Sequence, residues 1–355
     1  MINRKFLKNS TIGLLSVVLC GLLTLIVMEV VKFSRSHRDN DKISGEKKIK
    51  IGFSLGTLKE ERWIRDRDIL MAKAKEMGAE LIVQNANNDD KDQLKQVKYL
   101  LEQKIDVLIL VPNDNIKSAK AVELAKEQGV PVISYDRLVL NADIDLYVSF
   151  DNFKVGELMA NTLIQSEKLE NILIVNGAEN DYNTKMIKQG YDKVLKPLVS
   201  DGKVNIISEE WSANWLREYA FNVVDSKLQQ GEKIDAVIAG NDSLAQGVIE
   251  ALSEHRLTNK VKVVGQDADL RACQRIVEGS QYATIYKPIE KLAEPAIEVA
   301  LKLGKKESIY LKHTIYNGKN NVPYYVLTPI AVDKNNMEDT IIRDGFHLRE
   351  EVYKD

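Results

Sequence analysis

The feature that most constrains the fold is an alternation that runs along most of the chain. Short runs rich in Val and Ile are followed by longer stretches with helical spacing and charged faces. Strands that are apolar on both faces and alternate with helices are typical of parallel sheets covered on each side. The predicted strands are Ile49–Leu55, Leu81–Asn85, Val107–Val111, Val130–Tyr135, Tyr147–Phe150, Ile172–Val175, Val204–Ile207, Ala236–Ala239, Val261–Gly265 and Ala283–Tyr286.

Chain length turns this pattern into a two-lobe α/β prediction. A chain of 355 residues exceeds one ordinary core, and this many strands exceed one comfortable sheet. Predicted helices such as Lys91–Gln103 and Ile116–Glu127 lie between the strands. We therefore expect two doubly wound parallel-sheet lobes.

The first residues predict a membrane anchor. Arg4, Lys5 and Lys8 precede an uncharged run from Asn9 to Met28. A signal-peptide core has ~7–15 apolar residues and a spanning helix needs about 20, so the run favours an uncleaved helix. We expect residues 1–33 to hold a cytoplasmic N-terminus and one transmembrane helix, and residues 34–47 to form an exposed linker. A cleaved signal peptide and a lipoprotein signal at Cys20 are the alternatives.

Composition excludes other classes. A net charge of -2 argues against a nucleic-acid-binding surface. Cys20 and Cys273 lie in dissimilar settings and make a poor disulfide pair. Four histidines without ligand spacing argue against a transition-metal site, and no cofactor motif is present. Gly52–Gly56 matches the G-x-S-x-G nucleophile elbow, but Ser54 falls inside a predicted strand, so a sugar hydrolase is only a remote alternative.

Polar and aromatic residues gather where the predicted strands end. Ligands of open parallel sheets bind beyond the carboxyl ends of the strands, so these residues are site candidates. Amides, carboxylates and guanidiniums suit a small ligand with many hydroxyls, and a tryptophan face suits the apolar face of a sugar ring. The candidates are Arg62, Trp63, Asp136, Arg137, Asn183, Trp211, Trp215, Asn241, Asp242, Gln266, Asp267 and Lys287.

Each candidate also has a structural explanation. Arg62 and Asp66 form an i,i+4 pair, and we expect Asp66, Arg67 and Asp68 to lie on a solvated helix face. Asp242 is the expected helix cap and Trp211 the expected core residue. The coincidence at seven strand ends favours a binding site over these separate explanations.

Several segments resemble bacterial D-xylose-binding proteins, which are type I periplasmic sugar-binding proteins. The resemblance covers about Lys48 to His347. It rests on Ile51–Phe53 with Glu61–Trp63 and Asp66–Asp68, Ser134–Arg137, Ser149–Asn152 with Val155–Glu157, Gly240–Asp242, Gly265–Asp269 and Tyr286–Pro288.

The resemblance implies roles for individual residues and a hinge. The hydroxyls and ring oxygen of the sugar would be hydrogen-bonded by Arg62, Asp136, Arg137, Asn183, Asn241, Asp267 and Lys287. Trp63 and Trp215 would sandwich the ring. A hinge would close the lobes on the ligand. The implied crossovers lie near Asn152–Phe153, Tyr286–Pro288 and Asn317–Pro323.

From these crossovers we expect an N-terminal lobe of residues 48–152 plus 288–318. The C-terminal lobe would hold residues 153–286 plus 323–347, and residues 348–355 would form a tail. The expected function is extracytoplasmic D-xylose reception without enzymatic activity and without a cofactor. The anchor departs from released family members and favours signalling to a membrane sensor histidine kinase, with supply of an ABC permease as the alternative.

Overall fold

The computed structural model describes residues 48–165 and 169–354. The expected transmembrane anchor and the whole of the expected linker, residues 34–47, lie outside the described residues. Within residues 48–165 and 169–354, no helix is both long enough and apolar enough to cross a lipid bilayer.

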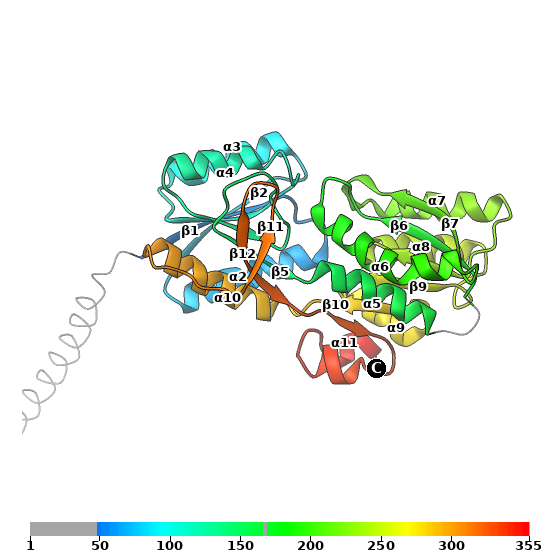
Figure 1. Ribbon diagram of the computed structural model, residues 1–355. Helices are drawn as coiled ribbons and strands as arrows, with labels where there is room; N and C mark the ends of the chain where they lie inside the picture. Colours follow the sequence, from blue (N-terminus) through cyan, green and yellow to red (C-terminus); the bar gives the residue numbers. More distant parts are fainter. Residues whose placement is uncertain (1–47, 166–168, 355) are drawn as a thin grey trace, which may run out of the picture. The chain divides into compact units, whose positions relative to one another are not determined.

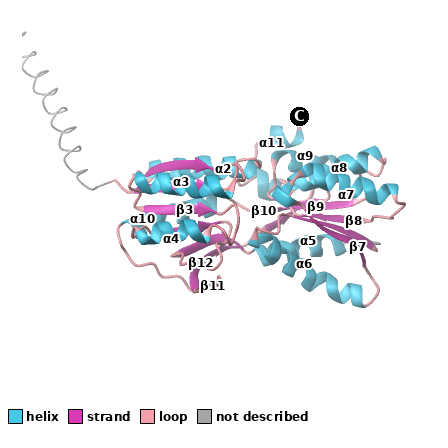
Figure 2. Cartoon of the chain, turned by 90° about the horizontal axis from the view of Figure 1, so that it is seen from above, coloured by secondary structure: helices cyan, strands magenta, loops and turns pink. Residues whose placement is uncertain are grey.

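Residues 49–355 contain two α/β lobes, each built on its own sheet. Figure 2 shows helices on both sides of the strands in each lobe. In the first sheet the strand order is β11-β12-β5-β4-β3-β1-β2, and in the second it is β13-β10-β9-β8-β6-β7. All neighbours pair in parallel except β11 with β12 and β10 with β13. The predicted fold of two doubly wound lobes is confirmed, with one antiparallel strand added at an edge of each sheet.

The first lobe alternates strands and helices from the start of the described chain. Its helices cover both faces of the sheet, and α10 enters it from later in the sequence. Its elements are β1 Lys50–Leu55, α2 Glu61–Glu76, β2 Glu80–Asn85, α3 Asp90–Glu102, β3 Val107–Val111, α4 Ala119–Glu127, β4 Val132–Tyr135, β5 Leu146–Phe150, α10 Glu290–Gly304, β11 His313–Tyr316 and β12 Asn321–Leu327.

The second lobe repeats the same winding. A short 3-10 turn, η1, and a π-helical turn, η2, interrupt the alternation. Its elements are α5 Asn152–Ile164, β6 Asn171–Asn176, α6 Tyr182–Ser200, β7 Asn205–Trp211, η1 Ala213–Trp215, α7 Arg217–Gln229, β8 Ala236–Ala239, α8 Asp242–Glu254, β9 Lys262–Gln266, α9 Leu270–Glu278, β10 Ala283–Tyr286, β13 Ile330–Val332, η2 Glu338–Ile342 and α11 Arg349–Tyr353.

Each sheet is buried on both faces because its strands are apolar throughout. In β3, Val107 and Ile109 pack into one core cluster, whereas Leu108 and Leu110 pack into the cluster on the other face. In β6, Leu173 and Ile174 divide in the same way between the two clusters of the second lobe. Alternate residues of a strand point to opposite faces, so a continuous apolar run fills two cores at once.

The chain crosses between the sheets three times. It leaves the first sheet after β5, returns after β10 through α10, and crosses again between β12 and β13. Figure 1 shows α10 and β12, in orange, among the blue and cyan elements of the first lobe.

The expected position of the third crossover is wrong. Residues 323–327 belong to β12, which pairs with β5 in the first sheet, so the crossing falls after Leu327 rather than at Asn317–Pro323. Proline has no N–H to donate to a neighbouring strand. Pairing with β5 begins only at Tyr324, so Pro323 lies outside that ladder.

The C-terminal residues form an ordered part of the second lobe, which corrects the expectation of a tail from residue 348. Val352 of α11 is buried with Ile341 and Phe346. Gln274 Nε2 on α9 also donates to the carbonyl of Glu351 at 2.7 Å. Packing against α9, which a local pattern does not reveal, gives this short helix its stability.

Helices α5 and α6 approach each other backbone to backbone. A Cβ on Gly156 would lie 1.9 Å from the carbonyl oxygen of Ile187, and one on Gly190 would lie 1.9 Å from that of Phe153. Only glycine fits this approach. The Val155-Gly156 segment noted in the sequence therefore has a packing role at the base of the second lobe.

Candidate binding site

One cavity collects the polar strand ends of both lobes. The space between its lining side chains, part of it open to solvent, is about 330 Å³. The nine residues to which the resemblance gives sugar contacts all line it, and three further residues join them. The lining residues are Glu60, Arg62, Trp63, Asp136, Arg137, Asp181, Asn183, Trp215, Asn241, Gln266, Asp267 and Lys287.

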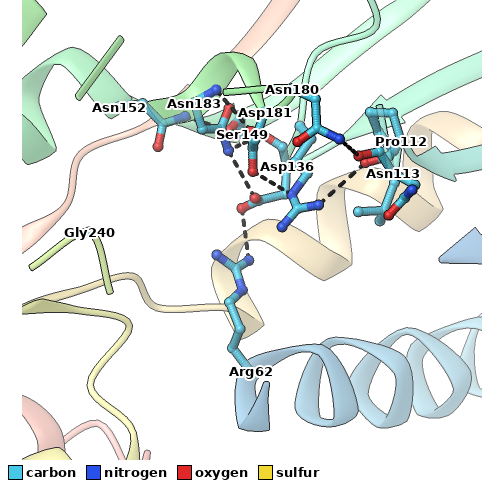
Figure 3. Close-up of polar contacts among 12 residues, drawn as sticks. Arg62, Pro112, Asn113, Asp136, Ser149, Asn152, Asn180, Asp181, Asn183 and Gly240 are labelled. Atoms are coloured by element: carbon cyan, nitrogen blue, oxygen red, sulfur yellow. Dashed lines mark hydrogen bonds and ion pairs between the residues drawn. The ribbon is translucent and has the colours of Figure 1, made fainter. Parts of the chain in front are cut away.

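Arg62, in the first turn of α2, holds the centre of the cavity. Its Nη2 lies 2.7 Å from Asp136 Oδ2 and 3.1 Å from Asp66 Oδ2, and its Nη1 lies 3.5 Å from Asp267 Oδ1. Figure 3 shows the side chain rising from α2 towards Asp136. All of these groups are buried. Arg62 thus joins carboxylates that the chain supplies from both lobes.

Asp66 corrects the expectation of a solvated helix face. Its side chain is fully buried, and its Oδ1 accepts a hydrogen bond from the hydroxyl of Tyr135 at 2.6 Å. Burial raises the pKa of Asp66 to about 6, although Arg62 acts in the opposite direction. The solvated face begins one residue later, where Arg67 and Asp68 form an exposed ion pair. Asp66 is therefore a buried ion-pair partner that helps to position the guanidinium of Arg62.

Asp136 is held by partners on several elements. Its backbone has a φ of 60°, a strained conformation for a residue with a side chain. The hydroxyls of Tyr147 and Ser149 donate to its carbonyl, and Asn183 Nδ2 donates to both its carbonyl and its Oδ1 at 3.1 Å. Burial alone would raise the pKa of Asp136, but Arg62, Lys287 and Arg137 outweigh it and lower the pKa. The carboxylate stays ionised and aimed at the cavity.

Arg137 pairs with Asp181, which is not among the residues selected from the ends of the predicted strands. The Nε of Arg137 lies 2.7 Å from Asp181 Oδ2, and both side chains are buried. Asp181 also caps α6 by accepting from the N–H of Asn183 at 3.0 Å. An Asp that could cap the helix after β6 is recognisable in the sequence. It could have indicated this residue, because helix caps and ligand contacts lie at the same edge of the sheet.

The second lobe contributes an acid and a lysine that pair directly. Lys287 Nζ lies 2.6 Å from Asp267 Oδ1. Asp267 follows β9 with a φ of 100°, again a strained backbone at the cavity. Gln266 Nε2 donates to the carbonyl of Gly240 at 2.6 Å, while Asn241 Oδ1 accepts from the N–H of Leu244 at 2.9 Å.

The helix cap of α8 is therefore Asn241, and the expectation that Asp242 is the cap is wrong. Asp242 is the first residue of α8 and is buried. Its oxygens accept from Gln281 Nε2 and Thr284 Oγ1, both at 2.8 Å. Those partners come from β10 and the loop before it, about forty residues along the chain, so the local sequence does not reveal them.

Two tryptophans line the cavity, one from each lobe. The guanidinium carbons of Arg62 and Arg137 lie 4.4 and 5.1 Å from the ring centre of Trp63, within cation–π distance. Trp215 ends the η1 turn with a φ of 55°. Its six-membered ring lies so close to Gly177 that a Cβ there would be 2.2 Å from Cη2. Each ring is held in place by its surroundings.

Trp211 is neither a cavity residue nor a core residue. It is the last residue of β7 and is half-buried, which corrects its assignment to the core. The strand is longer than predicted because its polar residues Ser208, Glu209 and Glu210 continue the pairing with β6.

Unpartnered polar atoms concentrate in this cavity. Among the described residues, the buried side-chain atoms without a hydrogen-bond partner include Glu60 Oε2, Trp215 Nε1 and Gln266 Oε1. Buried polar groups are nearly always hydrogen-bonded, and each exception needs an explanation. Three exceptions in one cavity are explained if a ligand supplies the missing partners.

Two further features of the described residues are the possible metal ligands and the serine of the G-x-S-x-G match. In residues 48–165 and 169–354, no group of three or more His, Cys, Asp or Glu side chains could hold a metal ion. Ser54 is buried within β1, where Gln93 Nε2 contacts its Oγ at 3.4 Å. The arrangement instead offers fixed donors, fixed acceptors and two aromatic faces.

Comparison with known proteins supports the architecture. Residues 51–308 match the model of the periplasmic binding protein domain. This chain belongs to that family. It is 44% identical to the D-xylose-binding periplasmic protein of Haemophilus influenzae, over 94% of this chain and 98% of the relative. It is 42% identical to the protein of the same name from Escherichia coli, over 86% of this chain and 93% of the relative.

A solved structure agrees in fold. The carbohydrate transporter solute binding protein of Chloroflexus aurantiacus, in complex with D-glucose, superposes with a TM-score of 0.80. It is 27% identical, and the match covers 86% of this chain and 98% of that one. The resemblance to bacterial D-xylose-binding proteins is confirmed at the level of the family and its relatives. The family that this chain matches is one of binding proteins.

Proposed function

We propose that this periplasmic binding protein is an extracytoplasmic receptor that closes on D-xylose. The observation that carries the proposal is the convergence of all nine candidates, two of them tryptophans, on one cavity. Fixed donors and acceptors match neighbouring hydroxyls, and a tryptophan face matches the C–H face of a pyranose.

The charges of the cavity favour an uncharged ligand. Each cation has a carboxylate partner within 2.7 Å: Arg62 with Asp136, Arg137 with Asp181, and Lys287 with Asp267. A site for an anion would leave cationic groups free for it. Here the positive charges are already matched, and what remains for a ligand is hydrogen bonding.

The choice of xylose rests on the two D-xylose-binding relatives. Calorimetry of residues 46–355 against xylose, ribose, arabinose, glucose and galactose tests it. We expect xylose to bind most tightly. Heat from another sugar without heat from xylose would reject xylose as the ligand, and silence from all five would reject sugar binding.

For the downstream role, we propose delivery of the sugar to an ABC permease. The D-xylose-binding periplasmic relatives and the carbohydrate transporter solute binding protein of similar fold support this role.

A second role rests on a separate observation. The basic Arg4, Lys5 and Lys8 followed by the uncharged run from Asn9 to Met28 favour a membrane anchor, which suits a receptor that reports to a sensor histidine kinase. Pull-down of the full chain from solubilised membranes, with and without xylose, distinguishes the roles. A permease subunit in the captured fraction supports transport, and a kinase supports signalling.

A further inference from the structure

Glu60 lines the cavity but takes no part in the ion pairs described above. It precedes α2 as the N-cap residue, yet its side chain makes no capping hydrogen bond. Its exposed fraction is 8%, and it lines the cavity with Arg62 and Trp63. Within the described part of the chain, Oε2 has no hydrogen-bond partner. A buried carboxylate in this condition is costly to the folded protein.

The other three carboxylates that line the cavity have cations of their own. Asp136, Asp181 and Asp267 each lie within 2.7 Å of an arginine or lysine nitrogen. Among the described residues, no cation lies within ion-pair distance of Glu60, so it is the fourth carboxylate beside three cations.

The surroundings of Glu60 do not supply its missing partner. Burial raises its pKa, while Arg137, its own backbone N–H and Lys59 act in the opposite direction and Asp267 adds to the rise. Neither Arg137 nor Lys59 forms an ion pair with it; Arg137 is committed to Asp181. In the absence of a ligand, Oε2 of Glu60 therefore has no hydrogen-bond donor among the described residues.

We propose that Glu60 accepts a hydrogen bond from a hydroxyl of the bound ligand and selects for ligands that carry a donor at that position. The proposal rests on the proposed sugar-binding function. It adds to the nine candidates a determinant that should disfavour deoxy, O-methylated and carboxylated ligands, because none of them offers a donor to a carboxylate there.

Glu60 lies five positions after the end of β1, closer to the strand than the candidates Arg62 and Trp63. The N–H of Trp63 donates to the carbonyl of Glu60 at 3.1 Å and closes the first turn of α2. That turn brings Glu60, Arg62 and Trp63 to the same rim.

The test compares the intact residue 46–355 protein with Glu60→Leu, Glu60→Gln and the control Asp68→Asn. Asp68 is an exposed acid on the same helix whose ion-pair partner is Arg67. The ligands are D-xylose and its monodeoxy analogues, measured by calorimetry. A lost hydrogen bond to a charged group is worth about 10- to 100-fold in affinity.

We expect Glu60→Leu to bind xylose at least about tenfold more weakly, with Glu60→Gln in between and Asp68→Asn like wild type. One deoxy analogue should bind wild type more weakly than xylose does. Glu60→Leu should bind that analogue with the same affinity as wild type does, because the analogue already lacks the hydroxyl that Glu60 contacts. This non-additivity identifies the hydroxyl that Glu60 contacts.

Wild-type affinity in Glu60→Leu would overturn the proposal. The proposal would also be overturned if the loss of affinity caused by Glu60→Leu and the loss caused by removing a hydroxyl were additive for every deoxy analogue. Glu60 would then contact none of those hydroxyls. Thermal unfolding of the ligand-free variants provides a second readout. Removal of an unpaired buried carboxylate should leave Tm unchanged or higher, whereas a structural residue would lower it. Failure of wild type to bind any sugar is a separate result and rejects the proposed function.

Discussion

The carboxylate of Glu61, in the first lobe, accepts from the backbone N–H of Leu270, in the second, with each oxygen 3.3 Å from that nitrogen. Leu270 is the first residue of α9, and the N-cap residue Asp269 makes no side-chain cap of its own. A residue of α2 therefore caps a helix of the other lobe. The contact joins the two lobes and lies outside the cavity lining, so we expect it to favour the proposed closed form without touching the ligand.

Replacing Glu61 by alanine should weaken ligand binding by about two- to tenfold, since a helix cap is worth roughly 0.5–1.5 kcal/mol and this one is exposed. Most of the change should appear as faster dissociation, because a closing contact acts after the encounter. Stopped-flow measurement of release checks this. Asp68→Asn on the same helix is the control, and equal release rates in both variants would contradict a closing role.

Replacing Asp267 by alanine should cost at least ~1–2 kcal/mol of binding. The change leaves Lys287 without its 2.6 Å partner and removes the carboxylate that Arg62 approaches from the first lobe. Calorimetry against xylose measures the loss. Trp215→Ala should cost at least as much, through the lost ring face. Full affinity in both variants would show that the ligand binds elsewhere.

Replacing Gly177 by alanine should reduce affinity although the residue contributes no side chain. The new Cβ would overlap the six-membered ring of Trp215, which must shift. We expect a loss of at least about tenfold, because an added methyl group in a packed region typically costs about 1–3 kcal/mol. Combining it with Trp215→Phe tests the cause, since the smaller ring should accept the methyl group. If the methyl group harms the double variant as much as the single one, the clash is not the reason.

The stability of the second lobe should fall as pH rises from about 4 to about 7. Burial raises the pKa of Asp242 from 3.8 to about 7 in the folded protein. Between those values the folded state holds a proton that the unfolded state releases, so a higher pH favours unfolding. Urea unfolding at about pH 5 and about pH 8 should show a difference on the order of 1–3 kcal/mol in wild type. An unchanged difference in Asp242→Asn would contradict the assignment to Asp242.

Sequence reasoning selected residues that line one cavity because the candidates share a topological position. The carboxyl ends of parallel strands meet at one edge, so Asp136, Asn241 and Asp267 converge although they are far apart in the chain. The same reasoning missed Glu60, Asp181 and Asp66. An acid one turn along a helix looks solvated from its neighbours alone, and only the approach of Tyr135 shows that Asp66 is buried.

Boundaries between the lobes show the same limit. Residues 323–327 satisfy the pattern of a strand for either sheet, and the pairing with β5 decides for the first. The tail from residue 348 is likewise a helix because α9 lies beside it.

The sequence by itself indicated the two doubly wound lobes and the nine candidates, because apolar periodicity is a local property that shows where each strand ends and which polar residues follow it. The tertiary structure decided how those residues are used. It gave each cation of the cavity at least one carboxylate partner, left Glu60 Oε2 without a hydrogen-bond partner among the described residues, and joined Glu61 to a helix of the other lobe. Pairing depends on distances of a few ångströms between segments that are far apart in the chain, and only the folded chain sets those distances.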